Sequence, residues 1–168
     1  MLAMLAKLLK VLNSDASPAQ ISAGFALALF IGLTPFFSLH NLVVLLLAFV
    51  LRINLSAFFL SSAVFTLIAY MIDGYSIALG EYLLAHPDLI ETWTQLYQSD
   101  VWRAFKFNHT LLLGSVAISI IAFIPVFLLG YLLINLYRHR VMAWVEKLKI
   151  SKFLKASKFY KLYEKMEG

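Results

Sequence analysis

A small group of polar side chains interrupts the longest uncharged stretch of the chain. His40 and Asn41 lie just over one helical turn after Pro35, inside a run of about 30 residues without a charged side chain. Polar groups at membrane depth are costly without a partner, so this group is a candidate functional site. Histidine can relay a proton or bind an ion there, or it can hydrogen-bond a carbonyl that the proline leaves free. We favour the structural role, and we expect the hydroxyls of Thr34 and Ser38 to share it.

Asp73 is the candidate intramembrane acid, because it is the only acid between Asp15 and Glu81. The glycine that follows it favours a position where a membrane span ends, and a pairing with His40 across helices is a minor alternative. The sequence has no cysteine, no Gly-x-Ser-x-Gly elbow, no His-Glu-x-x-His pair and no phosphate-binding glycine loop. We therefore expect no enzyme, and no catalytic residue, metal or cofactor.

These polar groups belong to an apolar run, residues 21–51, that Gly-Leu-Thr-Pro at residues 32–35 divides almost in half. Each half would rise about 20 to 24 Å as a helix, against a hydrocarbon core of about 30 Å. A non-helical joint at this depth needs protein or water around it. The run therefore predicts a broken or re-entrant helical hairpin, which either crosses the membrane or returns. Its break and candidate polar site comprise Gly32, Thr34, Pro35, Ser38, His40 and Asn41.

Local signals mark where the hairpin begins and ends. Ser17 and Gln20 can form a capping box around Pro18, which predicts a helix start. Small residues in this first half favour close helix packing, and Arg52 marks a return to the cytoplasmic interface.

Two further segments are long enough to cross a membrane. Residues 55–72 should emerge at Asp73, with residues 75–84 either extending this span or lying along the surface. Residues 109–136 would be about 40 Å long as a straight helix, so we expect tilt or a kink at Pro125.

The segment between the two spans, residues 85–108, is rich in aromatic side chains. Pro87 occupies a good first helical position, and Leu89, Trp93 and Tyr97 fall on one stripe, which predicts an amphipathic helix on the outer membrane surface. Asn108 and the histidine after it are expected to cap the last span.

Composition places the chain in a membrane. Hydrophobic residues make up 62% and charged residues 14%, and the mean hydropathy is +0.84, whereas soluble domains are about 45–50% apolar. The N-terminal segment is not typical of a signal peptide, because Lys7 and Lys10 lie within its apolar stretch. We expect an all-α integral membrane protein: a membrane domain, residues 1–136, with an N-terminal interfacial helix, and a basic cytoplasmic tail, residues 137–168.

The tail holds nine of the fourteen basic residues and three acids. The positive-inside rule then places both termini in the cytoplasm. Interleaved aromatic and basic residues predict an amphipathic tail on anionic lipid headgroups, and a merely solvated charged end is the equal alternative. Nothing in the pattern supports nucleic-acid binding. The expected lipid contacts are Arg138, Arg140, Lys152, Lys155, Lys158 and Lys161.

The chain also resembles a known family. The resemblance rests on S-P-x-x-I from Ser17, G-F-A from Gly24, F-I-G-x-x-P from Phe30 and L-R-I-N-L from Leu51. These motifs are similar to those of a bacterial inner-membrane domain of unknown function, number 2062. A narrower resemblance, to a small subfamily of about this length, rests on residues 33–35 and 38–42, the Trp-Arg and Phe-Asn pairs at 102–103 and 107–108, and the lysine-aromatic tail. Many members of the wider family carry Asn-Pro in the next helix, where this chain has Ser-Ser-Ala at residues 61–63.

The resemblance implies a location but no activity, because that family has no established catalytic residues. It implies the inner membrane of a Gram-negative-type cell. In the subfamily the gene commonly lies beside one for a much larger envelope protein, which implies a larger envelope membrane protein as partner.

We therefore expect an accessory or anchoring subunit of a cell-envelope assembly, with an assembly that handles lipid as one case. The alternative is a homo-oligomeric transporter or channel in which the broken hairpin forms the binding site.

Overall fold

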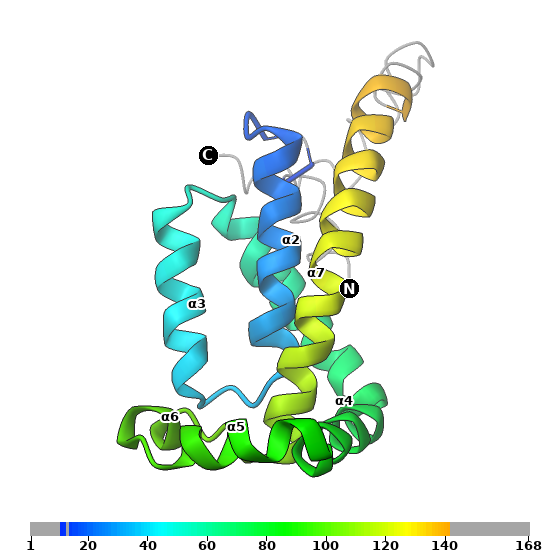
Figure 1. Cartoon of the computed structure of the whole chain (residues 1–168). Helices are drawn as coiled ribbons and strands as arrows, with labels where there is room; N and C mark the ends of the chain where they lie inside the picture. Colours follow the sequence, from blue (N-terminus) through cyan, green and yellow to red (C-terminus); the bar gives the residue numbers. More distant parts are fainter. Residues whose placement is uncertain (1–10, 13, 142–168) are drawn as a thin grey trace.

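The computed structural model describes residues 11–12 and 14–141, and every regular element in that part of the chain is helical. Figure 1 shows the arrangement. The elements are α2 (Pro18–Leu33), α3 (Leu39–Val50), α4 (Leu55–Ala85), α5 (Pro87–Tyr97), α6 (Asp100–Ala104), α7 (Thr110–Leu136) and a short π-helix, η1 (Tyr137–Val141). The segment expected to form an N-terminal interfacial helix, apart from Val11 and Leu12, and the tail beyond residue 141 lie outside the described residues.

Helices α2, α4 and α7 pack against one another and form the core (Figure 1). Glycines permit two of the closest approaches. A Cβ on Gly32 would lie 2.9 Å from the backbone oxygen of Ser62, and one on Gly114 would overlap the backbone oxygen of Ser76. Backbones that approach this closely gain van der Waals contact, which is the main attraction between helices in lipid.

Polar side chains inside this core are satisfied by their own helices. Ser22, Ser115 and Ser119 are fully buried. Their hydroxyls donate to carbonyls four residues earlier, at 2.7, 2.6 and 2.8 Å. No buried charge is needed to join the described helices, so small side chains and close packing account for the association.

Helices α2 and α3 are antiparallel and form a helical hairpin (Figure 1), and its crossing of the membrane or return within it stays a prediction. The capping box at Ser17 is present, and its hydroxyl accepts from the amide of Gln20 at 3.2 Å. Helix α3 stands to one side of the core (Figure 1). Only Asn41, Val44 and Ala48 are buried on it, a spacing that gives one narrow stripe.

Two of the described helices are long and apolar enough to cross a membrane, namely Leu55–Ala85 and Thr110–His139. Both helices of the hairpin are shorter. Helix α4 runs through Asp73 and Gly74 without a break, as in the alternative in which residues 75–84 extend the span, and the emergence from the membrane at Asp73 stays a prediction. Glycine in a helix interior costs only about 1 kcal/mol, which a long packed helix absorbs. Pro125 likewise lies inside α7.

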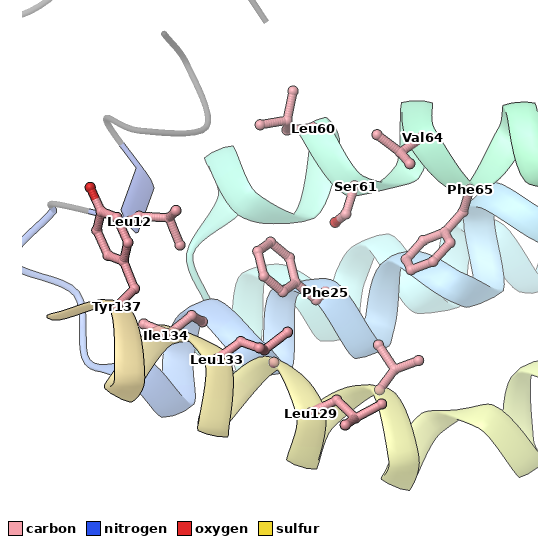
Figure 2. A pocket seen from close by; sticks show the side chains of 12 residues that line it. Leu12, Phe25, Leu60, Ser61, Val64, Phe65, Leu129, Leu133, Ile134 and Tyr137 are labelled. Atoms are coloured by element: carbon pink, nitrogen blue, oxygen red, sulfur yellow. The ribbon is translucent and has the colours of Figure 1, made fainter. Parts of the chain in front are cut away.

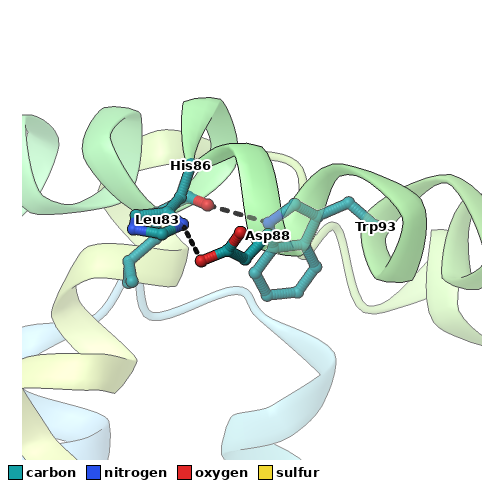
Figure 3. Close-up of polar contacts among 4 residues, drawn as sticks. All are labelled: Leu83, His86, Asp88 and Trp93. Carbon is teal, nitrogen blue, oxygen red and sulfur yellow. Dashed lines mark hydrogen bonds and ion pairs between the residues drawn. The ribbon is translucent and has the colours of Figure 1, made fainter.

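Helices α5 and α6 cross the end of the molecule where the α2–α3 turn lies (Figure 1). The amphipathic helix from Pro87 is confirmed. Figure 3 shows Trp93 reaching back from α5 toward the end of α4, where its Nε1 donates to the carbonyl of Leu83 at 2.8 Å. The Trp93 ring also stacks on Phe107, a buried residue just before α7, with centroids 5.8 Å apart. The aromatic cluster therefore fastens α5 to both long helices.

Candidate functional site

The predicted break is a five-residue connection between α2 and α3. Helix α2 ends at Leu33, and Thr34 is extended, with φ −108° and ψ 159°. Helix α3 begins at Leu39 after an extended Ser38, with φ −118° and ψ 140°. Pro35 has no backbone N–H, so the helix cannot continue through it. The connection leaves carbonyl groups that need other donors.

Asn41 supplies most of these donors. Its side chain is 7% exposed, and its Nδ2 donates to the carbonyls of Pro35 at 3.1 Å and Phe36 at 3.0 Å. The hydroxyl of Ser38 also donates to the Pro35 carbonyl, at 2.6 Å. The carbonyl groups at the break therefore find donors on side chains no more than six positions away in the sequence.

Thr34 links the asparagine to the histidine. Its Oγ1 lies 2.5 Å from the carbonyl oxygen of Phe30, 3.1 Å from Oδ1 of Asn41 and 2.9 Å from Nε2 of His40. A hydroxyl has one hydrogen, and the first two neighbours are acceptors, so Thr34 donates to one of them and accepts from the histidine. This assigns the Nε2–H tautomer to neutral His40, whose Nδ1 is buried and has no partner in the described part of the chain.

The surroundings of His40 are apolar. A cavity of about 310 Å³ lies beside it, between α2, α3, α6 and α7. Its walls include Val43, Trp102, Phe105 and Val116, and no acidic or basic side chain besides the histidine lines it. An isolated imidazole in such walls lacks the second group that acid–base chemistry needs. The approach of α6 to the hairpin gave no signal in the sequence.

Asp73 is not part of this cluster. It lies within α4 and is partly exposed, and no hydrogen bond or ion pair joins it to His40 or to another described residue. Gly32 also serves packing, since it faces α4. No group of three histidine or acidic side chains in the described residues could hold a metal ion.

Arg138 lies at the other end of α2. Its Nε donates to the carbonyl of Leu12 at 3.0 Å, and its Nη2 donates to those of Ser14 and Ala16 at 2.8 and 2.9 Å. The guanidinium thus ties the start of η1 to the loop before α2. The sequence did not distinguish this arginine from its basic neighbours, and its lipid contact stays a prediction. The side chain of Arg140 and the four lysines expected to contact lipid lie outside the described residues.

With the hairpin, the two long helices and the α5–α6 segment described, the family can be stated. A bacterial family, "Uncharacterized protein conserved in bacteria (DUF2062)", matches residues 3–143. The chain belongs to this family. The membership predicted from the motifs is thereby confirmed. Because the DUF2062 match ends at residue 143, all described helices fall within the family unit and most of the basic tail falls outside it.

The chain is also similar to a protein of a second bacterium. An "Uncharacterized protein" of Treponema pallidum (strain Nichols) is 25% identical over 138 residues, which are 82% of this chain and 85% of the relative. No solved structure matches the chain. The similarity therefore extends over most of both chains and is not limited to a short motif.

Proposed function

We propose that this DUF2062 protein is a multi-pass inner-membrane protein that serves as an accessory or anchoring subunit of a cell-envelope assembly. In this proposal a larger envelope membrane protein docks on the hairpin. The observation that carries it is that the polar side chains at the break are already hydrogen-bonded. Asn41, Ser38 and Thr34 bond to one another or to nearby backbone carbonyls. Hydrogen bonds of this kind indicate that the break has a structural role, because they leave few polar groups to bind a ligand or to react.

The break allows α3, an apolar helix, to stand apart from the core. The face of α3 that points away from the core is well exposed, with Leu46 at 58%, Phe49 at 56% and Val50 at 74%. Exposed apolar side chains are normal for a helix in lipid, but a 12-residue helix packed along only one stripe also offers its other sides to a partner helix. A partner would add the van der Waals contacts that the core helices already have.

The proposed orientation places the open end of the hairpin and both termini in the cytoplasm. Arg52 and Arg138 lie at this end, and Arg138 joins it to η1. The α5–α6 end carries Asp88, Glu91 and Asp100 beside two basic residues. An excess of arginine and lysine on one side favours the cytoplasm for that side. The hairpin then enters from the cytoplasm and returns to it.

Site-specific photo-crosslinking in native membranes tests the docking role. A crosslinker at Leu46 should capture a larger envelope protein, whereas one at Ile121, which is 70% exposed on α7, should capture it much less. Affinity purification in a mild detergent should recover the same protein. Recovery of a monomer or homo-oligomer alone, with no heterologous product from Leu46, would refute the proposal.

One observation favours a second candidate, a homo-oligomeric transporter or channel. The Nδ1 of His40 is buried beside a cavity and has no partner among the described residues. Several hairpins placed together would bring several such imidazoles to one path. Flux of ions into proteoliposomes should then fall in His40→Ala and Pro35→Ala variants, and unchanged flux in both would exclude this site.

A further inference from the structure

A lateral groove opens between α4 and α7, with α2 as its floor. Its volume is about 580 Å³, and Figure 2 shows Phe25 on the floor, between Ser61 of α4 and Leu129 and Leu133 of α7. The two helices that form its sides are the two that are long enough to cross a membrane. The groove therefore faces the lipid in the placement proposed above.

The walls of the groove are almost entirely apolar. Ser61 and Tyr137 contribute the only hydroxyl groups among the described lining residues. The hydroxyl of Ser61 donates to the carbonyl of Ala57 on its own helix, at 2.5 Å. A ligand in the deep part of the groove thus finds no donor and gains only from dispersion and close packing.

The length of the groove matches one leaflet of a bilayer. Along α7 and the start of η1 it extends from Val126 to Tyr137. A helix rises about 1.5 Å per residue, so this distance is about 16 Å, or half of a hydrocarbon core of about 30 Å. An acyl chain that starts at the interface beside Tyr137 would reach the bilayer centre at Val126.

Arg138 does not line the groove, but it follows Tyr137 at the mouth of the groove and is held in place there. Leu12 lines the groove with its side chain, and its carbonyl accepts from Nε of Arg138. An arginine has five N–H donors, and the three hydrogen bonds of Arg138 use Nε and Nη2. The Nη1 donors have no hydrogen-bond partner among the described residues. Three carbonyls orient the guanidinium, so binding of an anion there loses little side-chain entropy.

We propose that this groove is a binding site for one anionic phospholipid of the cytoplasmic leaflet. One acyl chain fills the space between α4 and α7, and the Nη1 donors of Arg138 hydrogen-bond the phosphate. The site rests on the membrane placement proposed above and does not depend on the docking of a partner protein.

Native mass spectrometry of the full chain, delipidated in detergent and titrated with phosphatidylglycerol, tests the site. We expect one strongly retained phosphatidylglycerol per chain and weaker retention of phosphatidylcholine. Val126→Trp fills the deep end and should weaken binding at least tenfold. Leu128→Trp is the matched control, because Leu128 is on α7 at similar depth, is 52% exposed and does not line the groove.

A second variant tests the mouth of the groove. Arg138→Lys keeps the charge but cannot bind three carbonyls and a phosphate together, so affinity for phosphatidylglycerol should fall about tenfold. Circular dichroism would verify that each variant is folded. If phosphatidylglycerol binds equally to the wild type and to Val126→Trp, the lipid is only annular and the proposal fails.

Other occupants give different results. A dimer that forms without lipid and is lost in Val126→Trp would assign the groove to a second copy. Lipid binding that appears only after deletion of residues 2–10 would assign it to that segment; either result overturns the proposal. Release of the protein from membranes by carbonate would instead refute the membrane placement, so the two failures are distinguishable.

Discussion

Replacement of Asn41 by leucine tests whether local hydrogen bonds hold the break. Leucine has the same number and branching of side-chain heavy atoms, so the change removes the amide without opening a cavity. The variant loses two donated hydrogen bonds, to the carbonyls of Pro35 and Phe36. We expect it to fold less stably while its exposed surfaces stay the same.

The size of the loss follows from the partners that remain. The Pro35 carbonyl keeps the hydroxyl of Ser38 as a donor. The Phe36 carbonyl has no second donor among the described residues, but Phe36 is 73% exposed, so water can reach the connection when it lies at an interface. No full desolvation penalty then arises. Two hydrogen bonds at about 0.6 to 1 kcal/mol each give a loss of about 1–2 kcal/mol in the free energy of unfolding.

Unfolding in mixed micelles with increasing dodecyl sulfate, followed by circular dichroism, measures this free energy. Asn135→Leu is the matched control, because Nδ2 of Asn135 donates to the carbonyl of Tyr131 on its own helix at an exposed position. It should change the free energy by less than about 0.5 kcal/mol, as exposed substitutions usually do. Equal stability of Asn41→Leu and the wild type would show that packing of α3, and not its hydrogen bonds, holds the break.

Three other substitutions have defined outcomes. Gly114→Ala should lower the free energy of unfolding by about 3 kcal/mol or more, because its Cβ meets a backbone carbonyl of α4 that cannot move aside as a side chain can. The control Gly74→Ala, at a position with open space, should raise the free energy of unfolding by up to about 1 kcal/mol in the same assay. If both substitutions changed this free energy in the same direction, the close backbone contact at Gly114 would be contradicted. Arg138→Gln should speed hydrogen exchange in the loop before α2, and unchanged exchange would mean that its three carbonyl contacts are dispensable. Phe107→Ala should cost about 3 kcal/mol, and it should shift the emission of Trp93 to longer wavelength in a variant with no other tryptophan.

Much of the hairpin was predictable because its determinants are near neighbours in sequence. Ser17, Pro18 and Gln20 form a capping box within four residues, and the structure has that box. The break follows from a proline that cannot continue a helix. We expected His40 and nearby hydroxyls to hydrogen-bond the carbonyls at the break. In the structure Asn41 and Ser38 bond the Pro35 carbonyl, while His40 contacts a hydroxyl.

The end of the first span was less predictable, since a single charged residue is weak evidence for a boundary. Asp73 and the glycine after it left open whether the helix ends there, and α4 continues to Ala85. The continuation depends on packing against α7, where Gly80 and Gly114 let two backbones meet. Such a contact joins residues more than 30 positions apart, and no local pattern indicates it.

The sequence by itself determined that this protein is helical, that it belongs to a bacterial family of membrane-type composition, and where its hairpin breaks. These properties depend on composition and on interactions within one or two helical turns. Only the tertiary structure showed that a lateral groove exists and where Arg138 binds. Its guanidinium donates to carbonyls 122 to 126 residues away. Contacts over such separations depend on how three helices pack, and one sequence does not encode that packing in any short pattern.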